Sequence, residues 1–160
     1  MIEHSEGTDT VDGGSGNLDR YVVEGTEQGE DITFKFSEDL AGGTPDIVVE
    51  VGGLETRVNV MQIEVAGVRA LGGDDHIHFE FGVNAGMKVY VDAGDGNDTV
   101  QLGQFQNDAE IDGGSGIDEV SIELGDEDND LALDDSTLTT SQLNHKVTNF
   151  ELANLTGNQA

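Results

Sequence analysis

The chain has 160 residues, no cysteine, and 34 acidic against 6 basic residues, which gives a formal net charge of −28. The lack of cysteine excludes a disulfide scaffold and a thiolate metal site. Because nucleic-acid phosphates repel so negative a chain, we expect no nucleic-acid partner. No apolar run approaches the roughly 20 residues of a membrane helix, and no signal peptide opens the sequence, so we expect no membrane insertion.

The apolar residues fall in short runs that are rich in β-branched and aromatic side chains. Low hydrophobicity with high charge is typical of disordered chains, but several of these runs alternate apolar and polar residues, which is the period of a half-buried strand. Gly, Asp and Asn separate the runs, as they do in turns. The runs lie at 32–36, 47–51, 58–60, 77–81, 89–91 and 120–124. We therefore predict one all-β domain, with a helical turn only at 135–143.

A repeat emerges when the chain is compared with itself. Residues 91–102 read VDAGDGNDTVQL and residues 111–122 read IDGGSGIDEVSI, at an offset of 20 residues. A third copy occupies 11–22 with an insertion at Leu18, a degenerate copy occupies 71–79, and a half copy occupies 7–11. Self-similarity at a fixed period of about 20 residues is the signature of a solenoid.

Each coil of this solenoid is expected to hold two turns and two strands, with strands at 77–81, 87–91, 99–102 and 109–112. Stacking places Asp75, Asp98 and Asp118 at one corner, one above another. It also places Ile77, Val100 and Val120 in one inward-facing ladder. We divide the single domain 1–160 into degenerate repeats (1–31), a meander or long coil (32–70), the best-formed coils (71–133) and a C-terminal segment (134–160).

The repeat unit reads G-G-x-G-x-D-x-U-x, where U is a large apolar residue. Residues 113–121 match every fixed position, and residues 93–101 match with Ala93 in place of Gly. The glycines let backbone carbonyls turn toward a shared centre, the Asp adds a carboxylate, and the apolar residue anchors the strand inside. An all-oxygen cage suits Ca²⁺ better than Mg²⁺, because Ca²⁺ accepts about 6–8 oxygens in irregular geometry.

The predicted calcium ligands form a stronger and a weaker set. The stronger set comes from the better repeats, above all at Asp98 and Asp118, and comprises Asp75, Asp92, Gly94, Asp95, Gly96, Asp98, Asp112, Gly114, Gly116 and Asp118. The weaker set comes from the broken copies and comprises Asp9, Gly14, Gly16 and Asp19. The alternative is that these Gly and Asp residues only form turns in an acidic protein.

These nonapeptides resemble the hemolysin-type calcium-binding repeats of the RTX family. The resemblance implies a parallel β-roll or β-helix that binds several Ca²⁺ ions and belongs to large secreted bacterial proteins. Residues 31–77 and 134–157 look like the segments that lie between repeats in such proteins. Two features depart from the family: the repeats are separated by longer coils, and the chain ends where another repeat is expected. We therefore expect a fragment of a longer protein.

The function expected from motif and resemblance is that of a calcium-binding structural or adhesive module, extracellular or at the bacterial cell surface, and not an enzyme. Expected partners are neighbouring domains of the parent chain, further copies stacked end to end, and a polysaccharide or cell-surface ligand. A self-assembling filament or surface-layer block is the alternative. A β-helix polysaccharide lyase or epimerase is less favoured, because Arg57, Arg69 and Lys88 are spread over different segments.

Two other groups of side chains, one acidic and one of histidines, are candidate metal ligands. Residues 126–130 are similar to an EF-hand loop, but Leu131 replaces the turn glycine and Thr137 the bidentate Glu, which leaves a solvated acidic turn or a looser calcium-binding turn. His76 and His78 flank the inward Ile77 and share the outer face of a strand. Two imidazoles at that spacing suit Zn²⁺ or Ni²⁺, but no third ligand is evident, so we expect an exposed pair.

Overall fold

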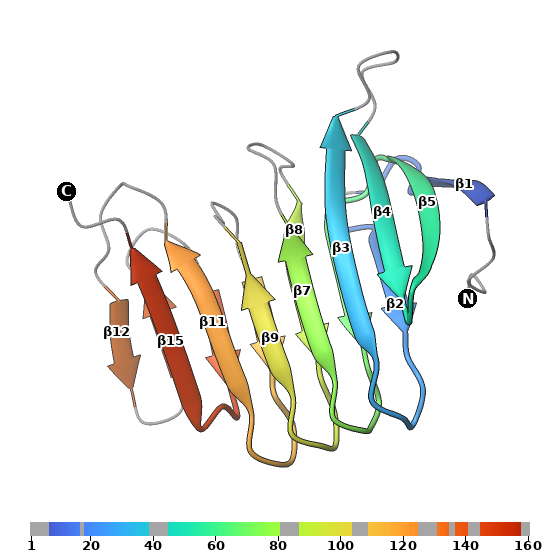
Figure 1. Ribbon diagram of the computed structural model, residues 1–160. Coiled ribbons are helices and arrows are strands. Elements are labelled where there is room, and N and C mark those ends of the chain that lie inside the picture. Colours follow the sequence, from blue (N-terminus) through green and yellow to red (C-terminus); the bar gives the residue numbers. More distant parts are fainter. Residues whose placement is uncertain are drawn as a thin grey trace.

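A computed structural model describes residues 7–16, 18–38, 45–80, 87–103, 109–124, 131–134, 137–140 and 145–157. Every regular element in these ranges is a β-strand, which confirms the all-β prediction (Figure 1). The described residues contain no helix with the length and apolarity needed to cross a membrane.

The strands form two sheets. Sheet A has the spatial order β1 (Gly7–Asp12), β5 (Leu54–Met61), β4 (Pro45–Val51), β3 (Asp31–Glu38), β7 (His76–Glu80), β9 (Thr99–Leu102), β11 (Glu119–Leu124) and β15 (Leu152–Gly157). Sheet B has the order β12 (Leu131–Asp134), β13 (Thr137–Thr140), β14 (His145–Thr148), β10 (Ala109–Asp112), β8 (Lys88–Asp92), β6 (Val65–Arg69) and β2 (Arg20–Glu24).

Both sheets are mixed. From β3 to β15 the neighbours in sheet A are parallel, and from β14 to β2 the neighbours in sheet B are parallel. In sheet A, β3, β4 and β5 form an antiparallel meander, and in sheet B, β12 and β13 form an antiparallel pair. A regular roll would be parallel throughout, so the uniform roll of about 20-residue coils is not what the two sheets display.

The helical turn predicted at 135–143 is wrong for the four residues of it that the structure describes. Thr137–Thr140 is strand β13, which pairs with β12 through Leu133 and Leu138. The remaining residues of that prediction lie outside the described ranges. The cause is tertiary: pairing with β12 and β14 overrides a weak local preference.

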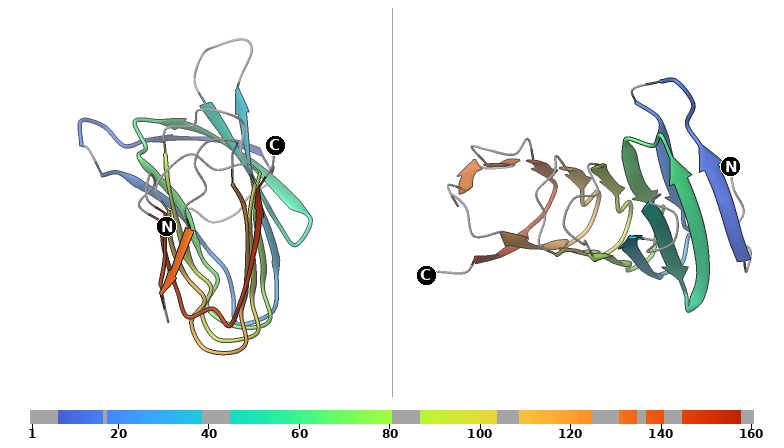
Figure 2. Two further views of the ribbon diagram at one scale, coloured as in Figure 1. Left: turned by 90° about the vertical axis from the view of Figure 1, so that its left-hand side faces the viewer. Right: turned by 90° about the horizontal axis from the view of Figure 1, so that it is seen from above.

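The chain alternates between the two sheets through two sets of corners. Five segments lead from sheet B to sheet A, and we call them the lower corners because they lie along the lower edge in Figure 1: residues 25–30, 70–75, 93–98, 113–118 and 149–151. Among the segments that lead back from sheet A to sheet B, two are described by the structure, residues 13–19 (except residue 17) and 62–64, and we call them the upper corners. Figure 2 shows the two layers of strands joined along the lower edge.

Side chains that point between the sheets form the core in continuous ladders. Ile77, Val100 and Val120 stand in register on β7, β9 and β11 and are fully buried, which confirms the predicted inward ladder. A second ladder includes Phe34 and Phe79, whose rings stack at 4.6 Å. Because parallel strands repeat the same face coil after coil, one apolar position in the repeat produces a whole column of core contacts.

Glycine lets the lower corners stack closely. A Cβ atom placed on Gly116, whose φ is 151°, would lie 1.5 Å from the carbonyl oxygen of Gly96 in the preceding corner. No side chain fits between these two backbones. The glycines of the repeat are thus required by corner-on-corner contact, whether or not an ion is bound.

We expect Phe79→Ala to lower the free energy of unfolding by about 3–5 kcal/mol, because it removes a buried ring and leaves a cavity against Phe34. Val22→Ala, on the outer face of β2, is the control and should change the free energy by less than about 0.5 kcal/mol. Urea unfolding at one fixed calcium concentration measures both. Equal effects of the two substitutions would contradict this assignment of the core.

Candidate functional site

Acidic side chains of the lower corners are linked into a ladder by backbone hydrogen bonds. The N–H of Asp75 donates to Asp98 Oδ1, and the N–H of Asp98 donates to Asp118 Oδ1, each at 2.8 Å. The ladder continues at both ends at the same distance: the N–H of Glu30 donates to Asp75 Oδ1, and the N–H of Asp118 donates to Glu151 Oε2. We call these five residues the acidic ladder.

The three central carboxylates of the acidic ladder are withdrawn from solvent. Asp75, Asp98 and Asp118 are only 2%, 1% and 0% exposed. In each, Oδ1 accepts a backbone N–H, whereas Oδ2 is buried and has no hydrogen-bond partner within the protein. A buried oxygen without a partner is strongly unfavourable, and for an ionised carboxylate the penalty is larger still. A proton or a cation beside each of these three oxygens would therefore remove this penalty.

Burial changes the acidity of these groups. It raises the pKa of Asp75 to about 7; the N–H of Glu30, which donates to this carboxylate, lowers the pKa by a smaller amount, and the repulsion of Asp98 raises it further. Burial likewise raises the pKa of Asp98 and of Asp118, again partly offset by the backbone N–H that each accepts. Without a cation, Asp75, Asp98 and Asp118 therefore hold protons more tightly in the folded than in the unfolded chain.

We expect the metal-free protein to become less stable as the pH rises. Because the pKa of Asp75 is raised above its unfolded value of about 3.9, its contribution to stability is fully present below about pH 4 and is lost as the pH passes about 7. The midpoint temperature of unfolding in chelator should fall between these limits, and less steeply in Asp75→Asn. Glu55→Gln, at an exposed position on β5 away from the acidic ladder, is the control. Stability that increases with pH over this range would contradict the prediction.

A second set of hydrogen bonds runs along the outside of the same corners in the opposite direction. Asp74 Oδ1 accepts the N–H of Asn97 at 2.8 Å, and Asn97 Oδ1 accepts the N–H of Ile117 at 3.1 Å. The series ends at Ile117, whose apolar side chain has no acceptor. The corners are thus held in register by side-chain acceptors on both their inner and outer sides.

The predicted ligands divide into groups by position. Gly94, Asp95, Gly96, Gly114 and Gly116 lie in the same corners as Asp98 and Asp118. Asp92 and Asp112 stand one residue before these corners, at the ends of β8 and β10, and their side chains have other contacts. Asp92 Oδ2 lies 3.4 Å from Arg69 Nε, and Asp112 Oδ1 accepts from Gly114 N–H and Asn149 Nδ2.

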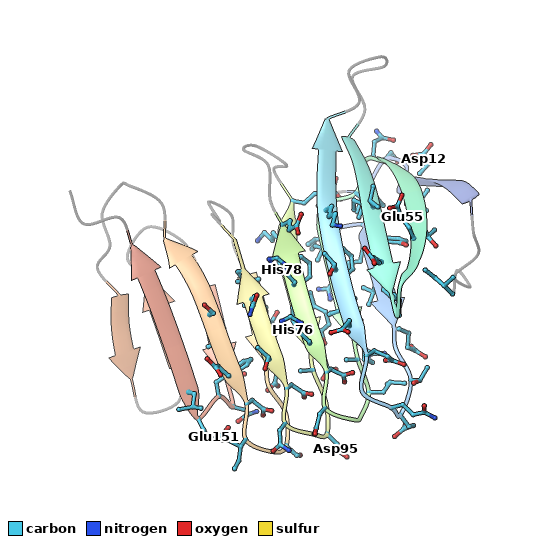
Figure 3. All side chains as sticks on the ribbon, viewed as in Figure 1. Asp12, Glu55, His76, His78, Asp95 and Glu151 are labelled. Atoms are coloured by element: carbon cyan, nitrogen blue, oxygen red, sulfur yellow. The ribbon has the colours of Figure 1, made fainter. Side chains whose placement is uncertain are left out.

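The weaker predicted set lies at the other edge of the sheets. Gly14, Gly16 and Asp19 belong to the upper corner 13–19, and Asp19 Oδ2 is also buried without a partner. The backbone of Asp9 lies in β1, and its side chain is outside the described residues. Figure 3 places Asp12, which precedes this corner, away from Asp95 and Glu151 on the lower edge. The broken repeat therefore does not join the column of the better ones.

Sequence reasoning missed four acidic residues that take part in corner hydrogen bonds: Glu30, Glu64, Asp74 and Glu151. Glu151 closes the acidic ladder, and Glu64 Oε2 accepts the N–H of Asp19 at 2.8 Å in the same way. A signal was present, because residues 60–66 (VMQIEVA) and 147–153 (VTNFELA) share Val, Glu and Ala at equivalent positions. These segments do not match the nonapeptide, so its pattern does not find them.

The two histidines lie on the outer face of β7, as expected for the neighbours of an inward Ile77 (Figure 3). His76 Nδ1 is 3.4 Å from Asp31 Oδ1, and His78 Nδ1 is 3.9 Å from Glu80 Oε1.

Across the described ranges, no three His, Asp or Glu side chains converge where they would hold a metal ion. A cation at the acidic ladder would therefore need backbone carbonyl oxygens as ligands too. Residues 126–130 lie outside the described ranges.

In comparisons with known proteins, no protein-family model, no curated protein and no solved structure matches the chain.

Proposed function

We propose that the chain is a calcium-dependent structural module, a segment of a β-solenoid whose Gly/Asp corners bind Ca²⁺ and thereby hold the coils together. The observation that carries the proposal is the buried, unpartnered Oδ2 of Asp75, Asp98 and Asp118. A cation beside these oxygens would replace the water that each lost on folding.

The chemistry of the corners favours calcium. Carboxylates and the carbonyls of tightly stacked glycine turns are hard oxygen donors, which bind Ca²⁺ or Mg²⁺ rather than softer metals. Fixed backbone carbonyls do not offer the near-ideal octahedron that Mg²⁺ requires, whereas Ca²⁺ tolerates irregular geometry. The net charge of −28 adds long-range attraction for a divalent cation.

Calcium binding would act as folding energy. Carboxylates on adjacent parallel strands are about 5 Å apart, so their charges repel when no cation separates them. An ion that binds only the folded chain stabilises it in proportion to the logarithm of its concentration. Sites with dissociation constants of roughly 10⁻⁴–10⁻³ M match extracellular calcium, in keeping with the proposed setting outside a bacterial cell.

The position of Arg69 supports the proposed structural or adhesive role over a catalytic one. Arg69, which would serve a polysaccharide enzyme, pairs with Glu24 and Asp92 on the outer face of sheet B and not with the acidic ladder. In this proposal the module spaces and stiffens neighbouring parts of a longer secreted protein, and the adhesive ligand is a polysaccharide or another cell-surface component.

We expect Asp98→Asn to separate the two effects of a buried carboxylate. The variant keeps an acceptor for the N–H of Asp75 but removes the charge, so the metal-free fold should become more stable while its stabilisation by calcium decreases. Far-UV circular dichroism and thermal unfolding at increasing Ca²⁺, with Mg²⁺ as control, measure both. Wild-type protein that is fully folded in chelator and indifferent to calcium would overturn the proposed function.

A filament-forming role is the second candidate, and the free edge of sheet A supports it. Strand β15 is the outermost strand there, and no described strand pairs with its outer side. Leu152 on this strand is 54% exposed, and Ile117 in the adjacent corner is 64% exposed. An unpaired strand beside exposed apolar side chains favours addition of another strand.

If copies associate through β15, Leu152→Lys should reduce the mass measured by size-exclusion chromatography with light scattering in calcium, because a charge on the edge opposes strand addition. Leu54→Lys is the matched control, since Leu54 is equally exposed but lies at the turn between β4 and β5. A wild-type protein that stays monomeric at all concentrations would remove this candidate.

A further inference from the structure

Two pairs of stacked corners, far apart in the chain, make the same contacts. The lower corner 113–118 stacks against the three-residue corner 149–151, and the upper corner 13–19 stacks against the three-residue corner 62–64. We call 62–64 and 149–151 the short Glu corners. Each consists of an amide residue, an apolar residue and a Glu, and each begins with a positive φ, 55° at Gln62 and 58° at Asn149.

The hydrogen bonds of the two corner pairs correspond one to one. Asp118 N–H donates to Glu151 Oε2, and Glu151 N–H donates to Asp118 O at 3.2 Å. Likewise Asp19 N–H donates to Glu64 Oε2, and Glu64 N–H donates to Asp19 O at 3.0 Å. In both pairs the Oδ2 atom of the Asp is buried without a partner. The same arrangement of hydrogen bonds therefore occurs twice, once at each edge of the sheets.

In both corner pairs, a carbonyl oxygen of the short Glu corner closely approaches a glycine of the longer corner. A Cβ atom on Gly113 would lie 2.2 Å from Asn149 O and 3.0 Å from Asp118 Oδ2. A Cβ atom on Gly13 would lie 2.2 Å from Gln62 O. A second glycine borders Asp19, because a Cβ atom on Gly16 would lie 2.4 Å from its Oδ2. Glycine is thus required at both places, because a carbonyl oxygen of the short Glu corner and the carboxyl group of the Asp converge on the position that a side chain would take.

The corners in the middle of the acidic ladder carry a methyl group at the matching position. Ala70 and Ala93 occupy the position that Gly113 holds in its corner, and both methyl groups are fully buried. The short Glu corners bring a carbonyl toward that position because their first residue has a positive φ. The two corner pairs closed by a Glu, which we call the Glu-closed pairs, therefore differ from the Asp–Asp steps of the ladder in the residue at this position and in the oxygen donors.

We propose that these Glu-closed corner pairs are two cation sites of a distinct kind, each taking one Ca²⁺ ion. The lower site consists of Asp118 Oδ2, Asn149 O and the Glu151 carboxylate. The upper site consists of Asp19 Oδ2, Gln62 O and the Glu64 carboxylate. This inference rests on the proposed calcium dependence, and it adds the short Glu corners and the upper edge, which the nonapeptide motif does not assign.

Each Glu-closed site joins two coils across an excursion of the chain. Asp19 and Glu64 are 45 residues apart and enclose the meander of β3, β4 and β5, whereas Asp118 and Glu151 are 33 residues apart and enclose β12 and β13. Ordering the ends of such long loops is entropically unfavourable. A cation at each closure offsets this entropy, so the sites clamp the coil that follows an excursion onto the coil that precedes it.

The test uses hydrogen exchange of the whole chain, read by mass spectrometry with and without Ca²⁺. In wild-type protein, calcium should slow exchange of the amides in 7–24 and 60–69 by at least tenfold. The double variant D19N/E64Q keeps oxygen acceptors at both positions but removes both charges, so it should lose this protection there while the corners 93–98 and 113–118 keep theirs. Glu55→Gln, at an exposed position on β5, is the charge-matched control and should behave as wild type.

The outcomes separate this inference from the proposed function. If D19N/E64Q keeps calcium protection of 7–24, the upper Glu-closed site is refuted and the calcium function stands. If calcium protects 7–24 in wild type but leaves 93–98 unchanged, the Glu-closed site stands and the central ladder is not a calcium site. If calcium changes no part of the wild-type chain, both are refuted. A circular dichroism spectrum of the variant in chelator checks that its fold matches wild type.

Discussion

The fold depends on one hydrogen bond that is repeated along the lower edge, from a backbone N–H of one corner to the buried carboxylate of the next. It holds Asp75, Asp98 and Asp118 in a line and brings glycine backbones into contact above and below them. The same bond leaves the second oxygen of each Asp without a partner. The register of the corners and the unpartnered oxygens on which the proposed cation binding rests therefore have a single origin.

This arrangement opposes two contributions to stability. The inward ladders, such as Ile77, Val100 and Val120, are continuous and dry, and their burial favours stacking of the coils. The buried carboxylates oppose it, because each must give up solvent and lie near another negative group. Under the proposed calcium dependence, pH and divalent cations decide which contribution dominates, so the same chain would be folded where calcium is plentiful and unfolded where it is scarce.

Excursions from the regular path are accommodated at particular corners. Where the chain leaves to form β3–β5 or β12–β13, the returning coil turns through a corner of only three residues, 62–64 or 149–151. Glu replaces Asp there, and its longer side chain reaches the N–H that an Asp in a full-length corner reaches elsewhere. Side-chain length thus compensates for corner length, and the hydrogen-bond pattern survives an insertion in the fold.

The sequence by itself determined the parts that depend on local repetition. Strands 99–102 and 109–112, the inward column of Ile77, Val100 and Val120, and the alignment of Asp75, Asp98 and Asp118 all follow from a period of about 20 residues and an alternation of period two. Only the tertiary structure decided that the corner 13–19 lies at the opposite edge and that Glu64 and Glu151 complete corner contacts. Those outcomes depend on β1 pairing with β5 and β11 with β15, and such pairing between residues more than 30 positions apart leaves no period in the sequence.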